Sequence, residues 1–339
     1  MVRLASYVSS GVFNNDVFNR QSPNNRDHGF EATILLKDLF AQHGIELNTP
    51  DVNAGKLVEF EIHLDARETP FSGPKYLIKL ETPAIHKANA NPRLLTSYRK
   101  IFTWNDTQVD GQRHIKLNFP NLLEHSPFVP FAQRTRFCCV IAGNKSVANH
   151  DDRELYSERV NSIRWFEQHA PSEFDLYGTD WNFPPPPPGL LGKLHTRFWR
   201  VFAPWLKFKF FPSYRGRVAC KSQVLSNTRF SLCYENVRDV PGYITEKIFD
   251  CFLSGCVPVY WGANNISDHI PADCFVDRRH FNTTAEVYAH LRQMDDATYT
   301  GYQERISSFL GSSRAKPFGI HAFASTIVQH ITMEHPLEG

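Results

Sequence analysis

Residues 231–263 read SLCYENVRDVPGYITEKIFDCFLSGCVPVYWGA and contain three apolar elements with polar residues where they meet. An apolar strand ends in Tyr234, Glu235 and Asn236, and a Pro-Gly loop follows it. An amphipathic helix then begins near Thr245, and a second apolar strand covers 256–262. Because strands that alternate with helices form parallel sheets, this stretch predicts an α/β fold.

The same alternation continues on both sides of this stretch. Apolar strands and one helix are expected in the first third of the chain, at 3–8, 31–44, 57–64, 76–83 and 100–106. After a connection rich in Pro and Phe, a strand at 136–143 opens a second series. We therefore expect two Rossmann-like domains, at 1–130 and 131–312. In the last segment, 313–339, Phe323, Ile327 and Ile331 share one helix face that would dock on a domain.

The composition indicates a folded protein without a strong overall charge. The 339 residues are 42% hydrophobic and include 27 Phe, and the formal net charge is +2. A charge this small provides no field that would attract nucleic acid, so we expect no nucleic-acid partner. Because no stretch resembles a signal peptide or approaches ~20 apolar residues, we expect a cytoplasmic protein.

An irregular segment separates the two halves of the second series. Five consecutive prolines at 184–188 precede KLHTRFWRVFAPWLKFKFF at 193–211, where aromatic and basic residues interleave. Three interpretations of this pattern remain open. The segment packs over the edge of a core, or it makes peripheral membrane contact through 194–211, or it stacks on bases or sugars.

The common nucleotide motifs are missing from the sequence. It has no G-x-G-x-x-G, no complete P-loop and no D-x-D pair that could hold a metal ion against a diphosphate. A diphosphate ligand would therefore need protein cations and helix N-termini. A lysine in the first turn of a helix is unfavourable for the dipole unless an anion lies opposite it, so Lys247 is a candidate phosphate ligand. Alternatively, Thr245 is only an N-cap and Lys247 a solvated charge.

Four segments in this region carry a resemblance to a known family. They are FSLCYEN (230–236), GYITEK (242–247), SGCVPVYWGA (254–263) and IPADCFVD (270–277). In order and spacing they resemble the signature of the α-1,3/1,4-fucosyltransferases, glycosyltransferase family 10. Tyr234 stands where that family usually has Phe. Weaker similarity extends over roughly 75–281.

The resemblance implies a GT-B architecture of two facing Rossmann-like domains, the first binding the acceptor and the second the donor. It implies inverting, metal-independent transfer of L-fucose from GDP-β-L-fucose to the 3- or 4-hydroxyl of GlcNAc. The acceptor would be a β-galactosyl-GlcNAc-type glycan, as in Lewis antigens, formed in protein glycosylation or polysaccharide biosynthesis. A transferase for another GDP-sugar such as GDP-mannose, or a non-catalytic glycan-binding protein of this fold, remains an alternative.

The resemblance also assigns roles to individual residues. Glu81, in YLIKLETPAIHKAN (76–89), matches the proposed general base, although a strand-end carboxylate bonded to a neighbouring turn is an alternative. Arg159 matches the diphosphate-binding arginine, with Arg153 or Arg164 in that role if the register differs. An arginine suits a diphosphate because its planar fork donates two parallel hydrogen bonds.

Five further residues are expected to contact substrates. Lys221, in YRGRVACKSQVL (214–225), resembles the lysine of the family's Y-x-G-x-x-x-x-K segment. Asn236, Tyr243 and Glu246 would hold the ribose, the fucose or the phosphates of the donor. Trp104 would stack on an acceptor sugar, or it is a buried core tryptophan.

Overall fold

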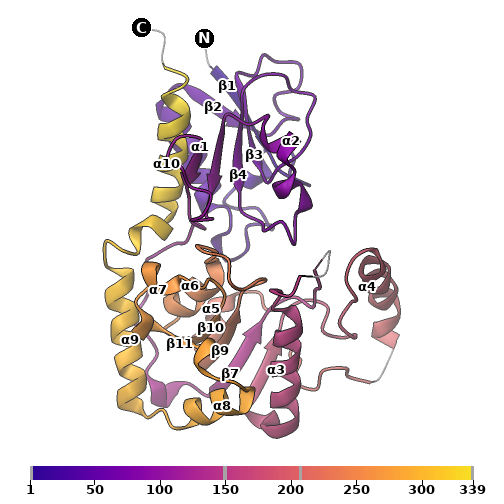
Figure 1. The fold of residues 1–339 in the computed structure, drawn as a ribbon, viewed down its shortest axis with the longest axis vertical. Helices are drawn as coiled ribbons and strands as arrows, with labels where there is room; N and C mark the ends of the chain where they lie inside the picture. The colour runs from indigo at the N-terminus through magenta and orange to yellow at the C-terminus, as the bar shows by residue number, and fades with distance from the viewer. Residues whose placement is uncertain (1–2, 148–150, 206–207, 337–339) are drawn as a thin grey trace. The chain divides into compact units, whose positions relative to one another are not determined.

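The computed structural model describes residues 3–147, 151–205 and 208–336. The chain divides into two compact units, the first formed by Met1–Leu122 with Lys316–Gly339 and the second by Leu123–Ala315. Each unit has its own parallel sheet with helices, so the predicted α/β organisation in two domains is confirmed (Figure 1).

Unit 1 contains a six-stranded sheet in the order β2-β1-β3-β4-β5-β6, and all the paired strands run parallel. Because β1 lies between β2 and β3, the strand order reverses there. The strands are β1 (Arg3–Val8), β2 (Ile45–Asn48), β3 (Phe60–Leu64), β4 (Lys75–Lys79), β5 (Lys100–Thr103) and β6 (His114–Lys116), and the helices are α1 (Glu31–Gln42) and α2 (Pro92–Leu95).

The last helix of the chain, α10 (Ile320–Thr332), belongs to unit 1. Its buried residues Phe323, Ile327 and Ile331 join the same hydrophobic core as Leu36 and Phe40 of α1. Figure 1 shows the two helices side by side. The expected docking of a C-terminal helix is therefore confirmed, and the domain that receives it is the N-terminal one.

Unit 2 contains a five-stranded parallel sheet in the order β11-β10-β9-β7-β8. The chain passes from β7 to β8, returns past β7 to β9, and continues outward, so the order switches between β7 and β9. The strands are β7 (Arg136–Ile141), β8 (Phe174–Tyr177), β9 (Thr228–Tyr234), β10 (Val257–Trp261) and β11 (Val276–Asp277). The helices are α3 (Tyr156–His169), α4 (Leu190–Phe202), α5 (Lys221–Leu225), α6 (Glu246–Leu253), α7 (Ile266–His269), α8 (Thr284–Arg292) and α9 (Asp296–Leu310).

A buried arginine connects the segments at the amino ends of these strands. Arg134 is 1% exposed, and its guanidinium donates hydrogen bonds of 2.7–2.9 Å to the carbonyl oxygens of Val129, Leu225, Thr228 and Ser254. Arg134→Ala would leave these carbonyls without their donor, so we expect the free energy of unfolding to fall by about 3–5 kcal/mol. Urea denaturation measures this change.

An exposed arginine supplies the matched control for that variant. Arg93 lies at the surface of α2, and Arg93→Ala is expected to change stability by less than about 0.5 kcal/mol. Equal effects of the two substitutions would contradict a structural role for the Arg134 network.

Crossing a lipid bilayer requires a helix of about 20 predominantly apolar residues. Among residues 3–147, 151–205 and 208–336, no helix is long and apolar enough for this.

Candidate donor site

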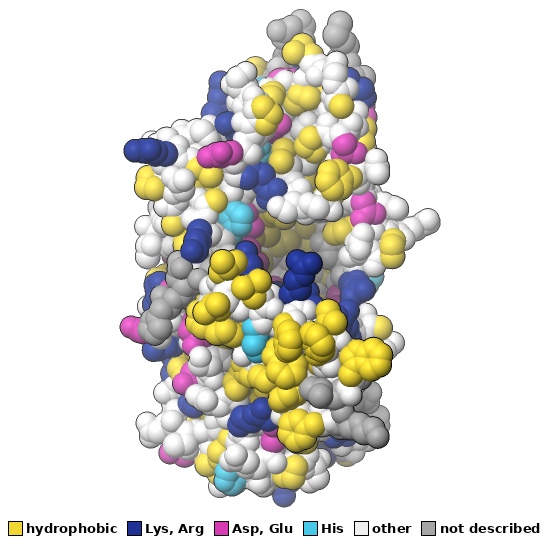
Figure 2. All heavy atoms as spheres, turned by 90° about the vertical axis from the view of Figure 1, so that its right-hand side faces the viewer, with side chains coloured by type: hydrophobic (Ala, Val, Ile, Leu, Met, Phe, Trp, Pro, Cys, Tyr) yellow, Lys and Arg dark blue, Asp and Glu magenta, His cyan; other side chains and the backbone are white. Residues whose placement is uncertain are grey.

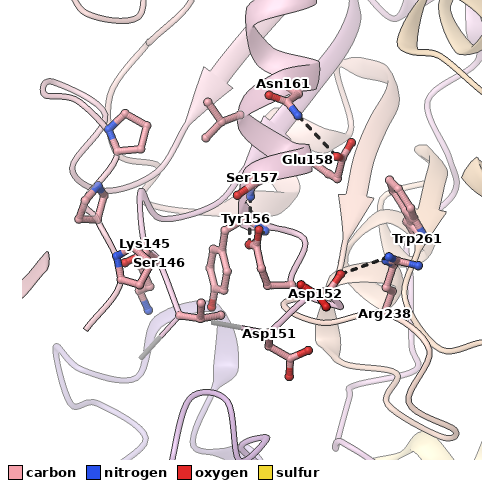
Figure 3. A pocket seen from close by; sticks show the side chains of 16 residues that line it. Lys145, Ser146, Asp151, Asp152, Tyr156, Ser157, Glu158, Asn161, Arg238 and Trp261 are labelled. Carbon is pink, nitrogen blue, oxygen red and sulfur yellow. Dashed lines mark hydrogen bonds between the residues drawn. The ribbon is translucent and has the colours of Figure 1, made fainter. Parts of the chain in front are cut away.

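A cavity of about 560 Å³ opens in unit 2 (Figure 3). Its lining comes from the loop after β7 with Lys145, the first turn of α3 and the proline run at 185–188. Arg238, in the loop after β9, and Trp261, the last residue of β10, complete it. These segments follow β7, β8, β9 and β10, so the cavity lies where the strand order switches. Open α/β sheets bind their ligands at this point, outside the carboxyl ends of the strands.

The cavity lining is rich in hydrogen-bond acceptors. Asp151, Asp152, Glu154 and Glu158 all contribute to it. The Glu154 carboxylate accepts hydrogen bonds from the backbone N–H groups of Tyr156 (2.7 Å) and Ser157 (3.1 Å), so the chain itself supplies the anion at the N-terminus of α3. The cavity is also lined by two cations, Lys145 and Arg238, so it carries charges of both signs. It suits an aromatic ring that carries N–H donors, such as a nucleobase.

A buried carboxylate organises the end of β9. Glu235 is 0% exposed, and its Oε1 accepts a hydrogen bond from the backbone N–H of Thr245 at 2.8 Å. Its Oε2 accepts from Thr245 Oγ1 at 2.8 Å and from Lys247 Nζ at 3.1 Å. Glu235 therefore ties the first turn of α6 to the strand that precedes it.

Thr245 is the N-cap of α6, because its side chain accepts from the backbone N–H of Lys247. Lys247 Nζ also bonds to Thr245 Oγ1 at 2.9 Å, and its side chain remains 23% exposed. Burial acts to lower the pKa of Lys247, but Glu235 and Glu246 raise it well above its usual value. Lys247 is therefore a permanent cation at a helix N-terminus, held by one buried carboxylate and still partly accessible.

Arg159 on α3 reaches the same strand end. Its Nη2 donates to the carbonyl oxygens of Tyr234 (2.8 Å) and Glu235 (3.3 Å), and the residue is 3% exposed. Desolvation by burial lowers the pKa of Arg159 from its usual value. Within the described part of the chain, no carboxylate oxygen lies within ion-pair distance of its guanidinium. The guanidinium also lies over the Tyr156 ring, 5.2 Å from its centroid. A buried cation with these neutral partners favours a nearby anion.

The two alternative arginines point elsewhere. Arg153 pairs with Asp151 at 2.9 Å and is largely exposed. Arg164 pairs with Glu167 at 2.7 Å and donates to the carbonyl oxygen of Phe210. Of these three candidates, Arg159 is the one that contacts the end of β9.

The remaining predicted donor residues are Asn236, Tyr243, Lys221 and Glu246, and they lie near α6. Asn236 Nδ2 donates to Tyr243 Oη at 3.3 Å, and Tyr243 is buried. Lys221 on α5 donates to Asp250 of α6 at 2.8 Å, and burial raises the pKa of Asp250 to about 7 although Lys221 opposes that shift. Glu246 is half exposed and lies 3.8 Å from Lys247 Nζ. We call the charged residues around α6 and the end of β9 the charged cluster; they are Arg159, Lys221, Glu235, Glu246, Lys247 and Asp250. Sequence analysis gave no role to two of its acids, Glu235 and Asp250.

None of the six predicted donor residues lines the cavity of Figure 3. The cavity and the charged cluster adjoin at the end of β9, since Arg238 follows Asn236 by two residues and Arg159 lies on the helix whose first turn lines the cavity. Sequence analysis missed the cavity because its lining combines the start of α3, part of the proline run and Trp261, which lie far apart in the sequence.

Glu81 lies in unit 1, just after β4, and buried side chains hold its backbone. Its N–H donates to Asp65 Oδ1 at 2.9 Å, which also accepts from the N–H of Leu80 at 3.0 Å. Its carbonyl oxygen accepts from Asn89 Nδ2 at 2.7 Å, and Asn89 is 0% exposed. Asp65 itself takes a left-handed conformation with φ 59°. The half-buried Glu81 therefore projects from a rigidly held strand end.

Trp104 takes part in the same support. It is 1% exposed, and its Nε1 donates to the carbonyl oxygen of Leu80 at 2.7 Å. A ring buried this deeply has no face to offer to a sugar, so the structure corrects the stacking interpretation and supports the alternative of a core tryptophan.

Comparisons with known proteins agree with this fold and this region. Residues 206–309 match the family model for the C-terminal part of glycosyltransferase family 10 (fucosyltransferase). An alpha-(1,4)-fucosyltransferase of Arabidopsis thaliana is 36% identical over 72 residues, which are 21% of this chain and 18% of that protein. An alpha-(1,3)-fucosyltransferase of Helicobacter pylori is 32% identical over 74 residues, 22% of this chain and 15% of that protein. The chain thus spans less than a fifth of the length of these two relatives.

Solved structures resemble the chain over nearly its whole length. An alpha1,3-fucosyltransferase crystallised with GDP-fucose superimposes with a TM-score of 0.50 and 14% identity, covering 97% of this chain and 90% of the other. Anabaena HepE, in complex with UDP and glucose, gives a TM-score of 0.55 and 9% identity, covering 98% and 100%. These likenesses establish the fold, which is the predicted GT-B type. The segment 206–309 is therefore similar to the C-terminal part of glycosyltransferase family 10, the fucosyltransferases.

Proposed function

We propose that this protein is an inverting glycosyltransferase that moves L-fucose from GDP-β-L-fucose to the 3- or 4-hydroxyl of GlcNAc in a β-galactosyl-GlcNAc-type glycan. One observation carries the proposal. The family-10 segment contains the N-terminus of α6, where Lys247 is held by the buried Glu235 at a carboxyl strand end of a parallel sheet. A helix N-terminus with a fixed cation in its first turn is suited to a diphosphate.

The donor would lie along the end of β9. The guanine ring would enter the cavity of Figure 3, where carboxylates can accept hydrogen bonds from its N–H groups. The diphosphate would lie toward Lys247 and Arg159. An ammonium group has three N–H donors, and Glu235 and Thr245 accept two from Lys247, so the third can point to a phosphate oxygen. With protein cations in this place, the proposed reaction requires no metal ion.

In the proposed reaction, the acceptor hydroxyl attacks the anomeric carbon from the face opposite to the departing GDP. The new bond joins the acceptor oxygen to that carbon, and the bond to the phosphate oxygen breaks with its electron pair remaining on GDP. Glu81 removes the acceptor proton as general base. Lys247 and Arg159 stabilise the charge that develops on the diphosphate, and one such donor is typically worth about 2.7–4 kcal/mol.

If Glu81 is the base, Asp65 is a positioning residue for it. Asp65→Ala removes the acceptor for two backbone N–H groups, so the strand end can shift. Because displacements of about 1 Å can cost 10²-fold in rate, we expect kcat to fall by up to that factor with GDP affinity unchanged. Asp65→Asn keeps the Oδ1 acceptor and should recover most of the loss. No difference between the two variants would contradict the positioning role.

Donor binding tests the proposed site directly. Isothermal titration in EDTA should show binding of GDP and GDP-fucose, with weaker binding of GDP-mannose and UDP-glucose. UDP-glucose is a useful comparison because a structural neighbour was crystallised with UDP and glucose. Preference for GDP-mannose would favour a transferase for another GDP-sugar. Absence of nucleotide binding would overturn the assignment of 231–263 as a donor site.

A further inference from the structure

Helix α4 exposes a broad apolar surface. Leu190 and Leu191 are about 70% exposed, Leu194 and Val201 59%, Phe198 52% and Phe202 49%. We call these six residues the α4 outer face. Figure 2 shows hydrophobic side chains gathered over this part of the molecule. Six large apolar side chains exposed on one helix are unusual for a surface that meets only water.

The opposite face of α4 packs against unit 2. Gly192 is buried, and a Cβ there would meet the carbonyl oxygen of Pro187 at 2.0 Å. Ser146 Oγ donates to that same carbonyl oxygen. Further along, Trp199 contacts Phe210 edge-to-face, with ring centroids 5.3 Å apart. The helix is therefore docked through one side. Packing over the edge of a core, which was one interpretation of this segment, accounts for the inner residues of α4. It does not explain the outer face.

Basic residues border the outer face. Helix α4 carries Lys193, Arg197 and Arg200 and contains no Asp or Glu. At 3.6 residues per turn, these three cations follow one edge of the apolar stripe. All three are exposed, and Arg200 is also paired with Asp180 at 2.7 Å. The surface therefore combines apolar side chains with positive charge.

From this combination, we propose that the α4 outer face binds the surface of an anionic lipid bilayer. The helix would lie in the interface plane, with its Leu and Phe side chains at the level of the acyl chains and its cations among the headgroups. Its 13 residues are too few to span a bilayer, which requires about 20. This inference is independent of the proposed transferase activity.

The charge pattern favours a bilayer over a second copy of the chain. In a twofold-symmetric dimer the same patch meets itself. When the two copies of α4 pack antiparallel, the cations that border the outer face approach like charges, and α4 offers no acidic residue to pair with them in either orientation. An anionic bilayer instead supplies the complementary charge along the whole edge of the helix.

Vesicle flotation of the full chain tests the proposal. We expect binding to vesicles of phosphatidylcholine containing one third phosphatidylglycerol, and at least about tenfold weaker binding to phosphatidylcholine alone. Raising the salt from about 0.05 to 0.5 M should also weaken binding, because the charges lie at the surface. Equal binding to both kinds of vesicle would overturn the electrostatic part of the proposal.

Two double variants separate the contribution of the apolar side chains to vesicle binding from the contribution of the cations. Leu194→Glu with Phe198→Glu should weaken binding to the anionic vesicles at least about tenfold. Lys193→Ala with Arg197→Ala should weaken it about thirtyfold, at roughly 1 kcal/mol per cation near the surface. Leu57→Glu is the matched control, because Leu57 is an exposed leucine of unit 1 and its replacement should leave binding unchanged.

Since all the substituted residues are exposed, circular dichroism should show the same fold for every variant. If wild-type protein does not float with either vesicle, the proposal is wrong. If in addition sedimentation equilibrium shows a dimer that Leu194→Glu with Phe198→Glu dissociates, the face binds a second copy of the chain.

Discussion

Replacing Glu81 by glutamine is expected to reduce kcat by about 10²–10⁴-fold while the affinity for GDP stays the same. The amide has nearly the shape of the carboxylate but cannot accept the acceptor proton. Asp65 and Asn89 bind the backbone of Glu81, so the strand end should keep its position in the variant. Steady-state kinetics with GDP-fucose, together with titration of GDP, measures both quantities.

An exposed carboxylate of the same unit provides the control. Glu68→Gln should change neither kcat nor GDP affinity, because Glu68 lies at the surface of unit 1. If Glu81→Gln retained full transfer, the general base would be another residue. If Glu81→Gln lowered GDP affinity as much as a change at Lys247, the separation of roles between the two units would be wrong.

Lys247→Ala is expected to weaken GDP binding by about 10–10²-fold, as the loss of one hydrogen bond between charged groups implies. The same substitution leaves Glu235, which is 0% exposed, without its cation. An uncompensated buried charge costs about 3–5 kcal/mol, so the free energy of unfolding should fall as well. Titration of GDP and urea denaturation of the same samples give the two effects.

A second variant distinguishes binding from stability. Lys247→Ala combined with Glu235→Gln removes the buried charge together with its partner, so most of the stability should return while GDP binding stays weak. Recovery of both properties in the double variant would mean that Lys247 only neutralises Glu235 and does not contact the donor.

Local patterns predicted much of the fold. The apolar run at 57–64 contains β3, and the run at 76–83 overlaps β4, which begins one residue earlier; each observed strand is shorter than its run. The helix expected from Thr245 is α6, with Thr245 as its N-cap. The partner of α10 could not be predicted, because its contacts with α1 join the two ends of the chain. The four-residue spacing of the apolar residues in 323–331 indicates an apolar helix face, but it does not indicate which element covers that face.

The candidate site could be predicted from the sequence only where its residues lie close together in one segment of the chain. Thr245 and Lys247 stand two residues apart, so their shared place in the first turn of a helix followed from the sequence. The support of Glu81 depends on Asp65, Asn89 and Trp104, which reach it from other parts of unit 1. Glu235 could have been suspected, since an acid that ends a buried apolar strand needs a partner. The sequence does not identify Lys247 as the partner of Glu235, because the two residues meet only through the turn between β9 and α6.

Acceptor-dependent release of GDP from GDP-fucose in the presence of EDTA tests the proposed activity most directly. With N-acetyllactosamine present, we expect rapid release of GDP, and mass spectrometry should show one added deoxyhexose on the acceptor. Without acceptor, release should be slow. GDP binding without any transfer to this acceptor would contradict the proposed substrates, and transfer that stops in EDTA and returns with a divalent metal would contradict a metal-independent reaction.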